Sequence, residues 1–535
     1  MKSVVRSLLL AVVTIAVTTT PCVERLQAQA AAPAAAKAAA DLPADLDAYV
    51  ANVMRTFEVP GLSLAIVKDG KVLLAKGYGV RKLGEAAPVD AKTLFGIASN
   101  TKVFTSTALG LLVEDGKVAW DAPVITYLPW FRMSDPYVTR EMTVRDLLVH
   151  RSGLGLGAGD LLWWPESTYD RKEVARRLKD LPLATSFRSA YAYDNVLYLV
   201  AGEVIEAVSG QSWETFVSDR ILKKVGMTGT NVRHSDATAA GNVATTHASV
   251  DGKVRPIKPF DSDNTNPAGG INSNAEDMAK WMNVLLAHGQ LADGSRLFSE
   301  RTYRQLTSLV TPMNVNQLPP EIARLQPNFV GYALGLNMTD YRGHKVAMHT
   351  GGLPGYVSKV LWIPDINFGV SVLTNQESGV AFESVVYRIT DHFLKESPYD
   401  WTAQFKTLSD RQRAAQAAAE KKASSSRASN SQPSLALAKY VGTYEDAWYG
   451  DIVIEQQKDR LTMKFSKTPA LTGDLEHFQY DTFIVRWRDR ELRADAYVTF
   501  ALNPDGTIDQ VKMRAVSGET DFSFDFQDLL LKLRK

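Results

Sequence analysis

A serine and a lysine three residues apart stand in the stretch Ile97-Ala98-Ser99-Asn100-Thr101-Lys102-Val103-Phe104. The apolar residues that follow predict a helix from Ser99 to about residue 115, and the spacing places Lys102 on the same face one turn later. A serine hydroxyl is a weak nucleophile until a neighbour takes its proton, and a lysine can do so once burial or other cations lower its pKa. A serine at a helix start is more often an N-cap. Because the pairing occurs once in the chain, Ser99 and Lys102 are a candidate nucleophile and base.

The residues before this stretch predict helices packed against an antiparallel sheet. Apolar residues at helical spacing over 46–57 predict an amphipathic helix. The β-prone runs 62–67 and 72–78 follow, separated by Asp69-Gly70, a dipeptide that supplies both positive φ angles of a tight hairpin. We therefore expect an α+β (α-β) fold in which an antiparallel sheet is flanked by helices.

Downstream motifs place further polar residues near predicted element ends. Tyr193-x-Asn195 lies on a loop just ahead of an apolar helix, and Trp163-Trp164 lies in a glycine-rich loop, where the rings serve either packing or a substrate cleft. His349-Thr350-Gly351 falls on a predicted strand, where glycine lets a ligand approach the backbone. Ser273-x-x-Glu276 reads as a capping box at the start of another helix.

The character of the chain changes beyond Trp401. Residues 401–433 are Ala/Lys-rich and then Ser-rich, which predicts a linker. The last hundred residues alternate apolar and polar residues between turns, which predicts a small antiparallel β-barrel or sandwich over 434–535. No residue of this region suggests itself as catalytic, so we expect it to be dispensable for the chemistry.

Composition narrows the classes of function. Among 535 residues, 60 basic and 59 acidic residues give a net charge of +1, which argues against nucleic acid as a partner. Residues 1–30 have the layout of a cleavable secretory signal, with an apolar run too short for stable membrane insertion, and 31–40 form an Ala-rich leader. We therefore expect a periplasmic or secreted protein. The sole cysteine, Cys22, lies within that signal, so the mature chain lacks the residues for disulfides or thiol catalysis.

The three motifs Ser99-x-x-Lys102, Tyr193-x-Asn195 and His349-Thr350-Gly351 occur once each and in this order. Residues 41–400 thereby resemble the serine β-lactamase and penicillin-binding protein superfamily, and most closely its class C β-lactamase and D-Ala-D-Ala carboxypeptidase branch. The resemblance implies an antiparallel sheet with an all-helical subdomain. The stretch that begins at Tyr440 resembles the lipocalin-like domain found in many peptidases and esterases of this group.

Residue by residue, the resemblance implies roles for the motif side chains. Ser99 would be acylated, Lys102 would be its base, and Tyr193 would relay the proton to the leaving nitrogen. Asn195 would hold Lys102 or a substrate carbonyl. The backbone N–H groups of Ser99 and Gly352 would form an oxyanion hole, which stabilises charge that appears only in the tetrahedral state.

One departure from the β-lactamase pattern concerns specificity. His349, Thr350 and Gly351 stand where β-lactamases carry Lys-Thr-Gly, and histidine can be neutral at a pH at which lysine is charged. The resemblance associates this change with the peptidases and esterases of the group. The resemblance leads us to expect a serine peptidase that uses no metal or cofactor, and a similarity over the whole chain suggests small peptides with D- or unusual residues, such as linearised microcystin, as its substrates. An esterase, a β-lactamase and a penicillin-binding sensor that is acylated but not released remain alternatives.

Overall fold

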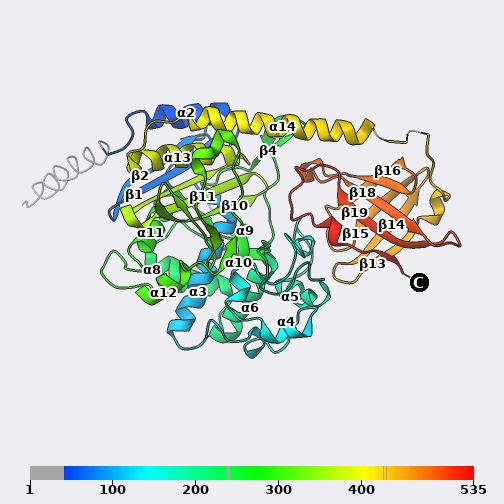
Figure 1. Ribbon diagram of the computed structural model, residues 1–535, viewed down its shortest axis with the longest axis horizontal. Coiled ribbons are helices and arrows are strands. Elements are labelled where there is room, and N and C mark those ends of the chain that lie inside the picture. Colours follow the sequence, from blue (N-terminus) through cyan, green and yellow to red (C-terminus); the bar gives the residue numbers. More distant parts are fainter. Residues whose placement is uncertain (1–40, 238–240, 426, 429, 535) are drawn as a thin grey trace, which may run out of the picture. The chain divides into compact units, whose positions relative to one another are not determined.

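The first large sheet is antiparallel and has eight strands in the order β2-β1-β12-β11-β10-β9-β8-β7. Helix α13 packs on one face, against β11 and β12, and α11 packs on the other, against β1, β2 and β12 (Figure 1). The strands are β1 (Gly61–Lys68), β2 (Lys71–Gly79), β7 (Thr311–Met313), β8 (Val330–Tyr332), β9 (Asn337–Tyr341), β10 (His344–Leu353), β11 (Tyr356–Ile363) and β12 (Phe368–Thr374).

This computed structural model describes residues 41–237, 241–425, 427–428 and 430–534. The predicted signal over 1–30, with Cys22, and the leader over 31–40 lie outside the described residues. In the described part of the chain, no helix is both long enough and apolar enough to cross a membrane.

The hairpin β1–β2 confirms the prediction made from Asp69-Gly70. Ile66 pairs with Leu74, and the two turn residues have φ angles of 50° and 75°. Asp69 adopts the left-handed conformation that Asn and Asp tolerate best after glycine, which explains the sharp reversal between the buried strand β1 and the partly exposed strand β2.

Helices joined by loops form the chain between β2 and β7, beside two short strand pairs, β3 (Phe95–Gly96) with β6 (Asn272–Ser273) and β4 (His247–Val250) with β5 (Lys253–Pro256). The helices are α2 (Leu46–Thr56), α3 (Lys102–Glu114), α4 (Pro136–Glu141), α5 (Arg171–Arg177), α6 (Val196–Ser209), α7 (Trp213–Val217), α8 (Lys223–Val225), α9 (His234–Ala237), α10 (Asn266–Gly269), α11 (Ala275–Leu286), α12 (Glu300–Leu306), α13 (Gly379–Leu394) and α14 (Trp401–Ser425). Phe104 on α3 stacks on Trp281 of α11, with ring centroids 4.3 Å apart, and this apolar contact ties the site-bearing helix to the helix under the sheet.

One capping prediction is wrong in its detail. Helix α11 begins one residue later than a capping box at Ser273 requires, because the side chain of Asn274 accepts a hydrogen bond from the backbone N–H of Asp277. Asparagine caps helices as well as serine does, so the local sequence offered two equivalent starts.

The segment predicted as a linker over 401–433 contains the 25-residue helix α14. Its first residue, Trp401, is buried and donates from Nε1 to Asp391 Oδ2 on α13 at 2.8 Å. The Ala/Lys-rich composition favours a helix intrinsically, and this tryptophan anchors it at one end.

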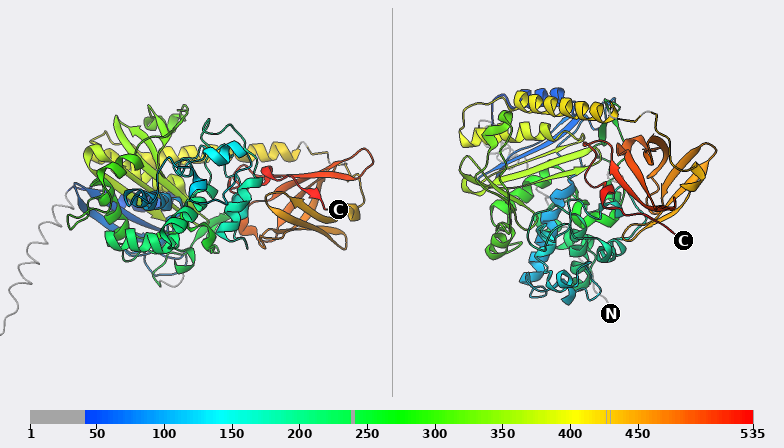
Figure 2. Two further views of the ribbon diagram at one scale, coloured as in Figure 1. Left: turned by 90° about the horizontal axis from the view of Figure 1, so that it is seen from below. Right: turned by 45° about the vertical axis from the view of Figure 1, so that its right-hand side comes forward.

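The last strands form a second antiparallel sheet, which is nearly closed into a barrel, as predicted (Figure 1 and Figure 2). Strand β20 pairs with β13, and Leu531 forms a bridge with Val511 of β19, so the two ends of the sheet approach each other. The strands are β13 (Gly442–Asp446), β14 (Gly450–Gln457), β15 (Arg460–Phe465), β16 (Thr472–Gln479), β17 (Thr482–Trp487), β18 (Ala496–Leu502), β19 (Ile508–Ala515) and β20 (Lys532–Leu533).

Candidate functional site

The turn that presents Ser99 is held in an unusual backbone conformation. Ala98 has a φ of 48°, a left-handed value that costs a non-glycine residue about 1 kcal/mol. A short 3₁₀ helix, Ala98–Thr101, follows and runs directly into α3. The carbonyl of Ile97 accepts a hydrogen bond from the hydroxyl of Ser358 on β11 at 2.8 Å, which fixes the turn against the sheet.

Lys102 is fully buried, and its ammonium nitrogen has three oxygen neighbours. Nζ lies 2.9 Å from Ser99 Oγ, 2.7 Å from Asn195 Oδ1 and 3.0 Å from the carbonyl of Ala268. A carbonyl and an amide oxygen can only accept. A neutral lysine amine therefore spends its two N–H groups on Asn195 and Ala268, and its lone pair is left facing the serine hydroxyl.

Burial lowers the pKa of Lys102 to about 7, and the carboxylates of Asp160 and Asp194 oppose this shift. Desolvation favours the neutral amine because an ammonium loses its hydration in the interior. The neutral amine is therefore well populated near pH 7, as it must be if a lysine is to take the proton of a serine.

Asn195 is oriented by a buried carboxylate that the sequence motifs did not indicate. Its Nδ2 donates to Asp160 Oδ2 at 2.8 Å, so the opposite end of the amide, Oδ1, must face Lys102. Asp160 Oδ1 accepts from Trp163 Nε1 at 2.9 Å. Asp160 thus fixes which way the Asn195 amide points.

Tyr193 stands beside both Ser99 and Lys102. Lys102 Nζ lies 4.9 Å from the centroid of the Tyr193 ring. Burial raises the pKa of Tyr193 well above its usual value, against the effect of its hydrogen bond with the Ser99 side chain. The phenol is therefore protonated in the resting protein, and it can act first as a proton donor.

His349 lies on β10, and both of its ring nitrogens have protein partners. Nδ1 is 2.5 Å from the carbonyl oxygen of Thr350, which can only accept, so Nδ1 carries the proton. Nε2 then accepts from the hydroxyl of Tyr332 at 2.8 Å. Burial, with the nearby charge of Lys102, lowers the pKa of His349 to about 3, so the ring stays neutral. This agrees with the expected loss of a permanent cation, but it leaves His349 without a spare N–H for substrate.

The glycines after His349 have different surroundings. β9 pairs with β10 over residues 344–348, and His349–Leu353 extend past its end, beside the turn that bears Ser99. A Cβ on Gly351 would lie 2.2 Å from the carbonyl oxygen of Ile97. A Cβ on Gly352 would meet no atom of the described chain within 4 Å, and Thr350 is exposed. Thr350 and Gly352 therefore border open space.

A family model for β-lactamase matches residues 46–392 of this chain. The chain belongs to the β-lactamase family. A second model, for a domain of unknown function, matches residues 426–533 and covers the barrel.

One relative and two solved structures are similar to this chain. The unguisins hydrolase ungD of Aspergillus violaceofuscus is 28% identical over 488 residues, 85% of each chain. The octameric penicillin-binding protein homologue of Pyrococcus abyssi has a TM-score of 0.58 at 21% identity, over 91% of this chain and 99% of the other. The D-amino acid amidase of Ochrobactrum anthropi, solved with L-phenylalanine amide, has a TM-score of 0.54 at 24% identity, over 66% and 98%. The two structures show the same fold, and this chain is a serine hydrolase of the family.

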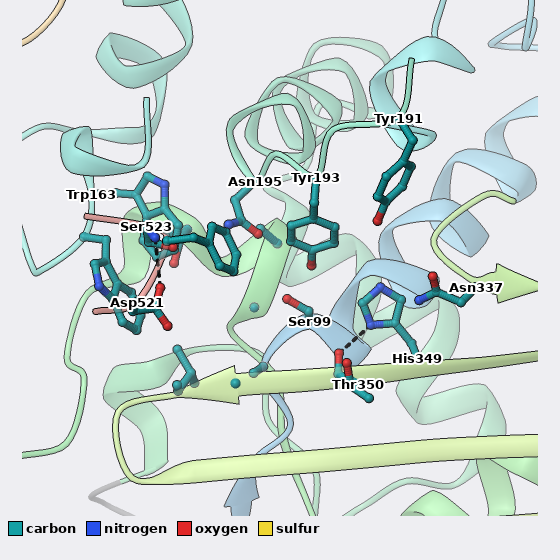
Figure 3. A pocket seen from close by; sticks show the side chains of 18 residues that line it. Ser99, Trp163, Tyr191, Tyr193, Asn195, Asn337, His349, Thr350, Asp521 and Ser523 are labelled. Carbon is teal, nitrogen blue, oxygen red and sulfur yellow. Dashed lines mark hydrogen bonds between the residues drawn. The ribbon is translucent and has the colours of Figure 1, made fainter. Parts of the chain in front are cut away.

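A cavity of about 290 Å³ opens in front of Ser99 in this β-lactamase-family site (Figure 3). Trp163 and Trp164 form one wall, and Phe260 stacks behind Trp164 with ring centroids 5.4 Å apart. The paired tryptophans are buried and also face the cavity, so they contribute both to packing and to the wall of the cleft. Such a wall suits an apolar or aromatic group of a ligand.

The barrel also contributes to the cavity lining, through Asp521, Phe522 and Ser523. These residues, with Asp160 and Tyr332, were missed from the sequence. Asp160 stands in a glycine-rich loop that drew attention only for its tryptophans, and residues 521–523 belong to a region without any catalytic motif. The five predicted side chains Ser99, Lys102, Tyr193, Asn195 and His349 do come together.

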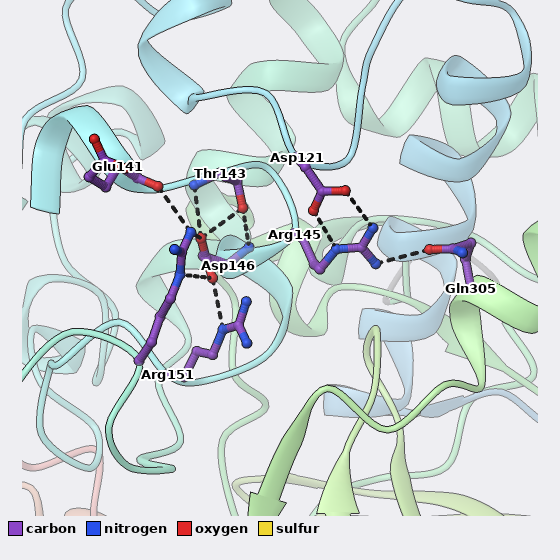
Figure 4. Close-up of polar contacts among 8 residues, drawn as sticks. Asp121, Glu141, Thr143, Arg145, Asp146, Arg151 and Gln305 are labelled. Carbon is purple, nitrogen blue, oxygen red and sulfur yellow. Dashed lines mark hydrogen bonds and ion pairs between the residues drawn. The ribbon is translucent and has the colours of Figure 1, made fainter.

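A network of charged residues anchors the loop that leads to Tyr193 (Figure 4). The buried carboxylate of Asp146 accepts from Arg151 Nε at 2.8 Å and from Arg188 Nη2 at 2.5 Å. The backbone N–H of Arg188 donates to the carbonyl of Arg151. Asp146 thereby joins the segment at Arg151 to the segment at Arg188. Nearby, Arg145 bonds the exposed Asp121 and Gln305.

Proposed function

We propose that this protein is a secreted serine peptidase that cleaves amide bonds of small peptides through an acyl-enzyme on Ser99. The observation that carries the proposal is the direction of the Lys102 lone pair, which faces Ser99 Oγ at 2.9 Å because Asn195 and Ala268 take the two N–H groups of the neutral amine. We propose Tyr193 as the second proton-transfer group.

Acylation uses these groups in order. Lys102 takes the proton of Ser99 while Oγ attacks the substrate carbonyl carbon, and the carbonyl oxygen becomes an oxyanion. We assign the stabilisation of this oxyanion to two backbone N–H groups, that of Ser99 and that of Gly352 on the open edge of β10. Donors of this kind each contribute about 3–4 kcal/mol to the transition state.

Collapse of the tetrahedral state breaks the C–N bond. The phenol of Tyr193, bonded to Ser99, gives its proton to the leaving nitrogen, and the proton held on Lys102 replaces it. Water then attacks the ester, passes its proton back through the same pair, and releases the acid and free Ser99. The net reaction consumes one water molecule for each amide bond.

The site and its relatives together support the proposed substrate class. A neutral His349 offers a substrate carboxylate no full charge, which disfavours β-lactam hydrolysis. The name of the Aspergillus relative describes a hydrolase of unguisins, and the Ochrobactrum protein is a D-amino acid amidase. With the aromatic wall, this supports peptides that contain D- or unusual residues, among which we include linearised microcystin. An esterase activity on the same site is the second candidate, since a small ester needs only Ser99, Lys102 and the oxyanion donors.

We further propose the domain division predicted above: a catalytic region over 41–400, a connecting segment over 401–433 and a barrel over 434–535. Secretion after cleavage near Ala30 is likewise a proposal, and it rests on the sequence pattern of residues 1–30.

The test is a substrate panel of D-residue peptides, p-nitrophenyl esters and a chromogenic cephalosporin, with Ser99→Ala as the control. We expect peptide and ester hydrolysis to exceed cephalosporin hydrolysis by at least about 100-fold, and Ser99→Ala to lose all three. Faster cephalosporin than peptide turnover would make the protein a β-lactamase. Stable labelling without turnover would make it a sensor.

A further inference from the structure

One short segment of the barrel, residues 521–525, contacts the loop that carries Asp160. Asp525 Oδ2 accepts from the backbone N–H of Gly159 at 2.6 Å, and Oδ1 accepts from that of Leu161 at 3.0 Å. Ser523 Oγ donates to Asp160 Oδ2 at 2.9 Å. Both Ser523 and Asp525 are buried. Three hydrogen bonds thus hold Asp160 and its two neighbours from a part of the chain more than 350 residues away.

The same segment packs against the loop and against Tyr193. A Cβ on Gly157, whose φ is 69°, would lie 2.8 Å from the Phe522 side chain, so the loop and the segment are in close contact. The Phe522 ring meets the Tyr193 ring edge to face, with centroids 6.0 Å apart. The segment therefore contacts two of the elements that face Ser99.

In the described chain, the Asp160 side chain accepts three hydrogen bonds. Asn195 Nδ2 and Ser523 Oγ share Oδ2, and Trp163 Nε1 takes Oδ1. Three donors around one carboxyl group match the ionised form, which only accepts. A proton on Asp160 would compete with one of these donors and loosen the amide of Asn195.

We propose that Ser523, supplied by the barrel, is a positioning residue for the Ser99 site: its hydroxyl orients the Asp160 carboxyl group through the hydrogen bond to Oδ2, and Asp160 in turn fixes Asn195 and the lone pair of Lys102. The inference rests on the proposed role of Lys102 as the base. It adds a path of contacts, Ser523 to Asp160 to Asn195 to Lys102, in which Lys102 is the member that takes part in proton transfer.

The charges around Asp160 set the sign of the expected effect. Burial raises the pKa of Asp160 to about 7, while the hydrogen bonds from Asn195, Ser523 and Trp163 and the charge of Lys102 oppose the rise. Asp160 also faces Asp525 and Tyr193, whose pKa values it helps to raise. Without the Ser523 hydroxyl, the Asp160 pKa rises further, so the oriented network is lost at a higher pH.

The experiment is a pH–rate profile of acylation by p-nitrophenyl acetate in the full chain, for the wild type, Ser523→Ala and Ser523→Thr. Ser517→Ala is the matched control, because Ser517 lies in the same region but its hydroxyl bonds Glu420. We expect the acid limb of Ser523→Ala to move up by about one pH unit, since one hydrogen bond to a charged group corresponds to a shift of that size. The limb of Ser517→Ala should stay with the wild type.

Ser523→Thr keeps a hydroxyl and should return the limb toward the wild-type position. An unchanged limb in Ser523→Ala, with or without a lower rate or melting temperature, would overturn the inference, because a purely structural serine moves stability alone. An equal shift in Ser517→Ala would overturn it as well. Ser99→Ala separates this inference from the proposed function: if that variant still turns over the ester, the proposed nucleophile is wrong, whatever Ser523 does.

Discussion

Replacing Gly351 by alanine should disable the site without touching any side chain proposed to react. The added methyl would lie 2.2 Å from the carbonyl oxygen of Ile97 and 2.6 Å from the hydroxyl of Ser358. Ordinary contacts of a carbon atom lie beyond 3 Å, so β10 and the turn over 97–98 must separate by about 1 Å. Ser99 follows that turn directly, and a misplacement of this size costs about 100-fold in rate.

The neighbouring Gly352 supplies a matched control. A methyl there meets no described atom within 4 Å, so Gly352→Ala adds the same group without moving the turn. The assay is the acylation rate with p-nitrophenyl acetate, together with the melting temperature of each variant. We expect Gly351→Ala to lose about 1–3 kcal/mol of folding free energy, the usual cost of overpacking, and about 100-fold in acylation. Gly352→Ala should keep the wild-type melting temperature. Wild-type acylation by a folded Gly351→Ala would refute the placement of Ser99.

Three further predictions concern charge. The acylation rate should rise with pH through about 7 and level off above it, because the neutral amine of Lys102 is the base, the ionised carboxyl group of Asp160 holds Asn195, and both groups have a pKa of about 7; a rate independent of pH between 5 and 9 would exclude this role of Lys102. Asp146→Ala should cost about 3 kcal/mol of unfolding free energy in urea melts, because it removes a buried carboxylate that bonds two arginines, one of them Arg188. The control Asp121→Ala removes an exposed carboxylate and should cost under about 1 kcal/mol. Equal losses in the two variants would contradict the stabilising role of the buried carboxylate. His349→Lys should move the acid limb below pH 7, because a second cation beside Lys102 disfavours its ammonium, and should favour cephalosporin over ester acylation; stopped-flow acylation at several pH values checks both.

The sequence identified the side chains that meet around Ser99 because each has a local signature. Ser99 and Lys102 are three residues apart on one helix, and Tyr193 and Asn195 flank one position ahead of α6. These spacings determine neighbours directly. His349 was also located, but its protonation could not be foreseen, since that depends on the carbonyl of Thr350 and on burial.

Contacts between residues far apart in the sequence could not be predicted, and the reason is physical. Asp160 acquires its role from Asn195 and from Ser523, which is 363 positions away. No pattern of spacing predicts a hydrogen bond across such a separation, because it forms only when two packed elements meet. The expectation that the barrel takes no part in the chemistry failed to anticipate Phe522 and Ser523 in the cavity wall. The helix α14 lies in a segment predicted as a linker, although its Ala-rich composition favours a helix.

The central claim is that Ser99 is the group that becomes acylated, and covalent labelling tests it most directly. The full chain is treated with a fluorophosphonate, digested, and mapped by mass spectrometry, with Ser99→Ala treated in parallel. The account predicts one adduct, on the peptide that contains Ser99, and none on the variant. An adduct on another serine, or equal labelling of Ser99→Ala, would contradict it.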